Sequence, residues 1–271
     1  MHVTPGDLRP VRRDGLVLRV AHLGGPTYVV VDAPEASAPG AGIETDCARE
    51  HWGYVVRGEV EVLSADGPLA VSEGSAFHVP AGVVHAIAAR PGTRVASFVP
   101  NPDEAVVRAG TMGAPPEPAT IDDRPSFTSG RPTVFGSRRA GDVEPRRITA
   151  EGRRMGAYVF SRVRLGPRSG YTAGVCDLPH WGLVVEGRLT VEWEDDVAAL
   201  AAGDLYHCPP GPPGHRLLAV DPAVLVDYTP VDAYARELRT PEWRATMART
   251  ILSSPAPDVD PGFAVEVAQL A

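Results

Sequence analysis

The chain has 271 residues, 44% of them hydrophobic, and its formal net charge at pH 7 is −8. This length suits one large domain or two smaller ones, and the apolar fraction is sufficient for a core. An acidic chain without a basic stripe argues against nucleic acid as a partner.

The N-terminal region and the hydropathy pattern argue against export and membrane insertion. Residues 1–20 lack the apolar core of a signal peptide, and no run approaches the length of a membrane span. We therefore expect a cytoplasmic protein without a membrane partner. Its three cysteines should then be reduced and available as ligands.

The elements expected along the chain are mostly short strands. Residues 54–63 and 183–193 are rich in β-branched side chains and carry a glycine at a turn, whereas residues 74–89 and 203–219 are typical of strand, tight turn and strand. Residues 101–145 have the Pro- and Gly-rich composition of a linker, and residues 232–253 form a helical stretch that Pro241 divides. This pattern predicts an all-β sandwich or small barrel architecture with a short C-terminal helical segment.

An internal repeat is the strongest signal in the sequence. Residues 47–85 match residues 176–215 at fifteen positions, with one inserted residue near the end. Six of the eight histidines and two of the three cysteines fall on matching positions. The repeated cysteine and histidine pairs are Cys47/Cys176, His51/His180, His78/His207 and His85/His215. Chance placement of such rare residues would not produce this agreement, so each copy is a candidate ligand site.

The repeated segments resemble the cupin family in its two-domain form. The second cupin motif, G-x5-P-x-G-x2-H-x3-N, is matched by "GSAFHVPAGVVH" and, with one extra residue, by "GDLYHCPPGPPGH". The final Asn is replaced by Ala89 and Ala219. The resemblance covers about two thirds of the chain. It implies two tandem cupin barrels, that is, double-stranded β-helix or jelly-roll folds, at residues 1–115 and 146–271, with a linker at 116–145.

The resemblance also locates the family's metal ligands, and this sequence changes them. In the first cupin motif, His51 and His180 stand at the glutamate position, and Cys47 and Cys176 stand at the second histidine position. His85 and His215 match the ligand histidine of the second motif. The family's His-His-Glu set is therefore altered in the same way in both halves.

The spacing of the Cys-x3-His pairs makes a structural demand. Four residues along a straight strand span about 13 Å, so Cys47 and His51 could not share one metal ion unless the chain turns between them. Pro179, directly before His180, favours such a break. Thiolate and imidazole ligands suit transition metals, so we expect up to one ion per barrel, with Zn²⁺ favoured and Fe²⁺ as the alternative.

The strand–turn–strand segments predict further neighbours. A turn centred just before Gly82 would place His78 opposite His85, and the second segment would likewise place His207 opposite His215. His78 and His207 are then either fourth ligands, which would close each site, or groups that only surround the ligands.

Several other residues are expected to serve packing. Trp52 and Trp181 should point away from the sites, toward another sheet or another subunit, which leaves a homo-oligomer open. Cys208 should face the opposite way from His207, into the core, and Tyr206 should also pack.

These observations predict a metal-binding protein with a small-molecule substrate or ligand. We expect an enzyme whose metal acts as a Lewis acid on a carbonyl-bearing compound, in cyclisation, isomerisation, decarboxylation or hydrolysis. One alternative is an Fe(II)-dependent dioxygenase, and another is a non-catalytic binding or sensing protein with structural metals. The sequence assigns no catalytic residue.

Overall fold

The computed structural model describes residues 2–23, 26–35, 41–99, 133–135, 148–167, 176–212, 214–230 and 233. Within these ranges the chain forms antiparallel strands and one short 3-10 helix, η1 (Pro5–Asp7), which confirms the all-β prediction. The helical segment expected at residues 232–253 lies outside the described ranges, except for Ala233, as does most of the expected linker. No helix in the described part is long and apolar enough to cross a membrane.

The chain divides into two compact units. One comprises residues 5–139, here called the N-terminal unit, and the other comprises residues 140–271 together with residues 1–4, here called the C-terminal unit. The first strand of the chain therefore belongs with the C-terminal unit, where it pairs with a strand some two hundred residues later. The domain bounds expected from the sequence, 1–115 and 146–271, stay a prediction.

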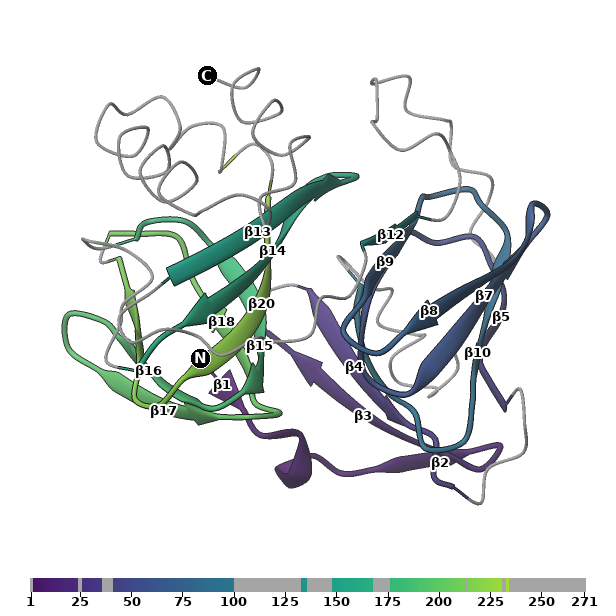
Figure 1. Cartoon of the computed structure of the whole chain (residues 1–271), viewed down its shortest axis with the longest axis horizontal. Coiled ribbons are helices and arrows are strands. Elements are labelled where there is room, and N and C mark those ends of the chain that lie inside the picture. The colour runs from purple at the N-terminus through teal and green to yellow at the C-terminus, as the bar shows by residue number, and fades with distance from the viewer. Residues whose placement is uncertain are drawn as a thin grey trace. The chain divides into compact units, whose positions relative to one another are not determined.

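The N-terminal unit contains two antiparallel sheets, and most of their strands are labelled in Figure 1. The seven-stranded sheet has the order β12 (Thr133–Phe135), β9 (Ala76–Val79), β6 (His51–Arg57), β11 (Arg94–Val99), β4 (Thr27–Asp32), β3 (Leu16–His22) and β2 (Val11–Arg13). The four-stranded sheet has the order β5 (Ala41–Cys47), β10 (His85–Ala89), β7 (Glu59–Ser64) and β8 (Gly67–Ser72). The inner faces of the strands bury a valine-rich core.

The C-terminal unit repeats this arrangement. Its six-stranded sheet has the order β1 (His2–Val3), β18 (Leu205–Cys208), β15 (His180–Glu186), β20 (Ala223–Pro230), β14 (Tyr158–Leu165) and β13 (Ile148–Met155). Its three-stranded sheet has the order β17 (Val197–Ala201), β16 (Arg188–Glu192) and β19 (Arg216–Ala219). Residues 54–63 and 183–192 thus belong to strands, as the sequence predicts.

The strand–turn–strand segments are not hairpins, and the predicted pairing of His78 with His85 is wrong. β9 pairs with β6 and β12 in one sheet, whereas β10 pairs with β5 and β7 in the other. The turn between them is bonded to a different loop, because the Gly82 N–H donates to the carbonyl of Ala48 at 2.8 Å. The chain therefore crosses from one sheet to the other at this turn.

The second unit makes the same crossing, so the predicted pairing of His207 with His215 is also wrong. The Gly211 N–H donates to the carbonyl of Asp177 at 3.0 Å. His207 lies on β18, which pairs with β15, and His215 bridges to Cys176 instead. In both units the repeated turn glycine bonds the crossing segment to the loop that follows the cysteine.

Gly53 and Gly182 occupy matching positions where the inner face has no room for a side chain. Gly53 pairs with Phe77 and Gly182 pairs with Tyr206 across neighbouring strands. An added Cβ at either glycine would overlap the partner's ring. Each aromatic ring therefore lies directly over its glycine, and this contact fixes how the ring enters the interior.

We predict that Gly53→Ala destabilises the protein by about 1–3 kcal/mol, the usual cost of overpacking a core. The reason is the overlap between the new methyl group and the Phe77 ring. Urea unfolding of the variant and the parent protein measures the difference. In a Phe77→Leu background the same glycine change should cost clearly less, since the ring is gone. Equal costs in the two backgrounds would contradict the packing argument.

Candidate metal centres

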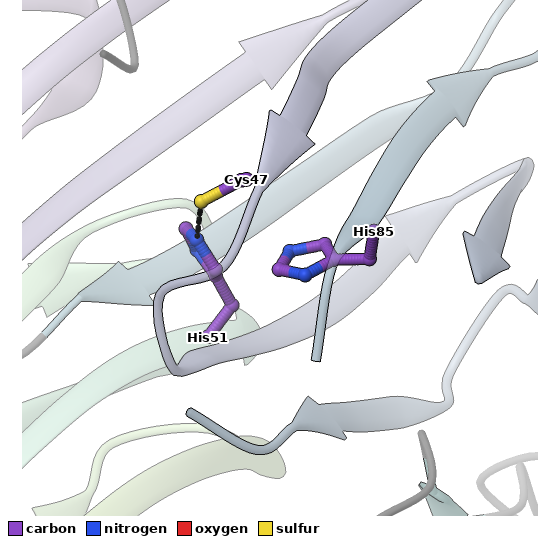
Figure 2. A group of neighbouring side chains, drawn as sticks. All are labelled: Cys47, His51 and His85. Atoms are coloured by element: carbon purple, nitrogen blue, oxygen red, sulfur yellow. Dashed lines mark hydrogen bonds between the residues drawn. The ribbon is translucent and has the colours of Figure 1, made fainter. Parts of the chain in front are cut away.

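The N-terminal unit brings Cys47, His51 and His85 together (Figure 2). Cys47 ends β5 and His51 begins β6, so the chain turns within the Cys-x3-His segment as the spacing requires. The Cys47 Sγ and His51 Nε2 atoms lie 3.1 Å apart. His85 begins β10 and is the cross-strand partner of Cys47. The group is thus built by one turn and one strand pairing.

The C-terminal unit brings Cys176, His180 and His215 together in the same way. Cys176 Sγ lies 3.1 Å from His180 Nε2. Cys176 and His215 form an isolated antiparallel bridge, in which each backbone N–H donates to the other's carbonyl, at 2.8 and 2.9 Å. In each unit the three candidate ligand atoms all lie within 4.8 Å of one another.

Hydrogen bonds at the outer ring nitrogens orient two of the histidines. The Nδ1–H of His85 donates to the carbonyl of Val83 at 2.7 Å, which leaves Nε2 of the neutral ring as the nitrogen with a lone pair. Nδ1 of His180 lies 2.8 Å from the Thr229 hydroxyl, so its Nε2 faces the Cys176 thiol. Such contacts fix the tautomer and the ring orientation of metal-binding histidines.

Burial keeps the imidazoles of the C-terminal group neutral. Desolvation, followed by the nearby His215 and His207 rings, lowers the pKa of His180 well below its ordinary value. Burial lowers the pKa of His215 to about 4. Neutral imidazole is the form that binds a metal ion, so these rings are ready to coordinate without losing a proton.

His78 and His207 lie outside both groups. The paired strands place His78 beside Trp52, where the two rings stack with centroids 4.9 Å apart, and His78 Nε2 lies 2.8 Å from the Glu50 carboxylate. His207 stacks on Trp181 in the same way, also at 4.9 Å. Because Trp52 follows His51 on the strand, this face is opposite to the one that carries the ligand candidates.

Cys208 lies in the core and on the opposite face from His207, as predicted, but its face is the one that carries the ligand candidates. It is the cross-strand partner of His180, and directly paired residues share a face, so it lies on the inner face beside the C-terminal group. Burial raises the pKa of the Cys208 thiol. The matching residue in the N-terminal unit is Val79, which pairs with His51. The sequence comparison aligned these positions but did not show which face they occupy.

Sequence reasoning also missed Asp227 and Thr229 on β20. Asp227 is 1% exposed, and its Oδ2 lies 4.0 Å from Nδ1 of His180. Burial raises the pKa of this carboxyl to about 7, and the hydrogen bond with Tyr206 acts in the opposite direction. The available signal was an acidic residue in a buried strand, "AVLVDYTP", directly after the apolar inward residues Ala223 and Leu225.

The donor set fits a transition metal ion. One sulfur and two nitrogens lie within 4.8 Å of one another, so small side-chain movements would bring them to the usual Zn–S distance of about 2.3 Å and Zn–N distance of about 2.0–2.1 Å around a common ion. Three protein ligands leave one position of a tetrahedral ion for water or a small molecule. Both groups are therefore compatible with metal binding.

Comparison with known proteins supports a cupin fold. The cupin domain family matches residues 36–99, which contain the whole N-terminal group. No curated protein matches the chain. Among solved structures, a mutant of Bacillus subtilis oxalate decarboxylase OxdC has a TM-score of 0.60 at 14% identity, with 93% of this chain and 84% of that chain covered.

Two further solved structures share the fold. AerE from Microcystis aeruginosa has a TM-score of 0.55 at 12% identity, covering 83% of this chain and 97% of that chain. A structure concerned with the Mn(II) centres of the Bacillus subtilis decarboxylase has a TM-score of 0.56 at 16% identity, covering 100% of this chain and 86% of that chain. The domain match and these folds together support the cupin superfamily for this chain.

Proposed function

We propose that this chain is a two-domain cupin that binds a transition metal ion in each unit and uses a metal as a Lewis acid on a small carbonyl-bearing substrate. The observation that carries the proposal is the pair of equivalent Cys-His-His groups, each with its ligand atoms within 4.8 Å. Cys47, His51 and His85 would hold one ion. Cys176, His180 and His215 would hold the other.

A bare cysteine–histidine hydrogen bond is the simplest alternative explanation for the 3.1 Å contacts. It does not account for the third residue, since a thiol needs only one acceptor. It also leaves both ring nitrogens of buried His215 without a hydrogen-bond partner among the described residues. Burying unpartnered polar groups is costly, and a metal ion bound by one of these nitrogens removes the cost for that nitrogen.

The ligand types favour zinc over manganese, although the oxalate decarboxylase structure concerns Mn(II) centres. Thiolate is a soft ligand that selects zinc and related ions, whereas manganese prefers oxygen ligands. Here the ligand candidates are one thiol and two imidazoles, with no carboxylate among them. Fe²⁺ stays the second choice, because a thiolate beside an oxygen-activating iron is exposed to oxidation.

A metal ion in this setting polarises a carbonyl oxygen. The chain supplies the surroundings: each ligand candidate is at most 5% exposed, which favours water exclusion around bound substrate. The same burial favours a second candidate function, a non-catalytic protein in which the metals are structural. The two functions differ in whether an exchangeable position exists on a metal.

We predict that purified protein contains close to two transition metal ions per chain. His51→Ala and His180→Ala should each remove one, because each deletes a nitrogen ligand of a different group. Elemental analysis by mass spectrometry measures the content. The matched controls are His78→Ala and His207→Ala, which remove buried histidines that lie on tryptophan rings. Unchanged content in the double variant of His51 and His180 would overturn the ligand assignment.

We predict that removing the metals destabilises the protein strongly. An ion present at about 1,000 times its dissociation constant contributes about 4 kcal/mol per site through binding to the folded state alone. Thermal unfolding before and after treatment with a chelator measures the loss, and adding Zn²⁺ back should restore the original midpoint. A midpoint that chelation leaves unchanged, in protein shown to be metal-free, would count against coupled binding and folding.

The catalytic proposal requires an open coordination position on a metal ion, and ligand binding tests whether one exists. Cobalt(II)-loaded protein should show a saturable change in its visible spectrum when acetohydroxamate, a small carbonyl-containing chelator, is added. Because a chelator can also remove the ion from the protein, the metal content is measured again after desalting. A spectrum that stays constant while both ions remain bound would favour the structural-metal candidate instead.

A further inference from the structure

The two units differ in one row of the inner face, which lies next to the metal group. We define this glycine row as the four residues, one on each of four neighbouring strands, that are paired side by side and include Gly53 or Gly182. In the N-terminal unit the row is Phe77, Gly53, Ser97 and Val29. In the C-terminal unit it is Tyr206, Gly182, Asp227 and Ser161. Each glycine is two residues from its ligand histidine, so the row shares that histidine's face.

The N-terminal row is mostly apolar. Phe77 and Val29 belong to the hydrophobic core of the unit. The Ser97 hydroxyl donates to the carbonyl of Trp52 at 3.3 Å. The row therefore completes an apolar interior beneath the Cys47 group.

The C-terminal row carries polar groups in the same place. Tyr206, Asp227 and Ser161 are exposed by 0%, 1% and 4% respectively. Tyr206 and Asp227 are the strand partners of Gly182 on either side, and Asp227 Oδ2 has no hydrogen-bond partner among the described residues. This oxygen lies 4.0 Å from Nδ1 of His180, the ring nitrogen on the other side of the imidazole from the Cys176 thiol.

The fold does not require these polar groups. The N-terminal unit has the same strand pairings, the same glycine under an aromatic ring and an equivalent Cys-His-His group, yet it places no acidic residue in the row. Burying a carboxyl costs free energy that its hydrogen bonds must offset, and one oxygen here lacks such a bond. A ligand that donates a hydrogen bond to Asp227 would provide it.

We propose that substrate binds in the C-terminal unit only, with Tyr206 and Asp227 recognising a hydroxyl group next to the carbonyl that the ion holds, and that the N-terminal group is structural. The substrate class is a small hydroxy-carbonyl compound, whose hydroxyl donates to Asp227 Oδ2. The inference rests on the proposed function, since it assumes that the C-terminal ion has an exchangeable position.

The experiment compares hydroxyacetone with methoxyacetone on cobalt(II)-loaded protein. The two compounds share the carbonyl group, and the oxygen on the neighbouring carbon carries a proton in hydroxyacetone and a methyl group in methoxyacetone. Visible spectra give a dissociation constant for each. In the parent protein hydroxyacetone should bind about tenfold more tightly, the upper end of what one hydrogen bond contributes. His51→Ala should keep this preference, whereas His180→Ala should abolish binding.

The decisive variant gives the C-terminal row the residues of the N-terminal row. Tyr206→Phe, Asp227→Ser and Ser161→Val together should keep both ions and the fold, because the chain already packs this combination around Gly53. The preference for hydroxyacetone should disappear, while methoxyacetone binding stays unchanged. Ser97→Ala is the matched control in the other unit and should alter neither constant. Asp227→Ser alone serves if the triple variant does not fold.

The outcomes separate this inference from the proposed function. If acetohydroxamate produces no spectral change in the parent protein, the proposed function fails. If acetohydroxamate binds but hydroxyacetone shows no preference, or the preference survives the row exchange, only the present inference is overturned. Preferential binding in the His180→Ala protein would also overturn it, because the N-terminal ion alone would then be responsible.

Discussion

The backbone pairing of each cysteine with the histidine of the second motif is the constraint on which both candidate sites depend. Cys47 is the strand partner of His85, and Cys176 exchanges two backbone hydrogen bonds with His215. Residues paired in this way hold their Cβ atoms within a few ångströms, whatever occupies the space between them. The site is therefore organised by the sheet before any ion binds.

A second tie brings the remaining ligand into place. The crossing turn is bonded to the loop after the cysteine, through Gly82 and Ala48 in one unit and Gly211 and Asp177 in the other. That loop is the turn of the Cys-x3-His segment, which returns His51 and His180 to the thiol. One short segment thus serves two purposes: it joins the sheets, and it folds a four-residue spacing into a single site.

The two units share this framework but differ in what surrounds it. Beside His51 the inner face carries Val79 and Phe77, whereas beside His180 it carries Cys208 and Tyr206. A duplicated fold allows one copy to keep the structural requirement while the other acquires polar groups. The burial of Asp227 without a full set of hydrogen bonds is the physical sign of such a division.

The sequence by itself determined the all-β class, the strands around Gly58 and Gly187, and the need for a turn between each cysteine and its histidine. These follow from local propensity, periodicity and the rise of a strand, which need no knowledge of distant contacts. Repetition of rare residues then singled out eight cysteines and histidines, and the structure brings six of them into two groups.

Only the tertiary structure decided which face each remaining residue occupies. The segment from His78 to His85 has the local pattern of a hairpin, and nothing within it shows that its strands belong to different sheets. Neighbouring residues on a strand point to opposite faces. The wrong hairpin prediction therefore placed His207 on the face of the ligand candidates and Cys208 on the other face, whereas the structure has the reverse. The place of Asp227 could not be predicted from local sequence either. Its distance to His180 is set by the pairing of β20 with β15, and the two residues are 47 positions apart in the sequence.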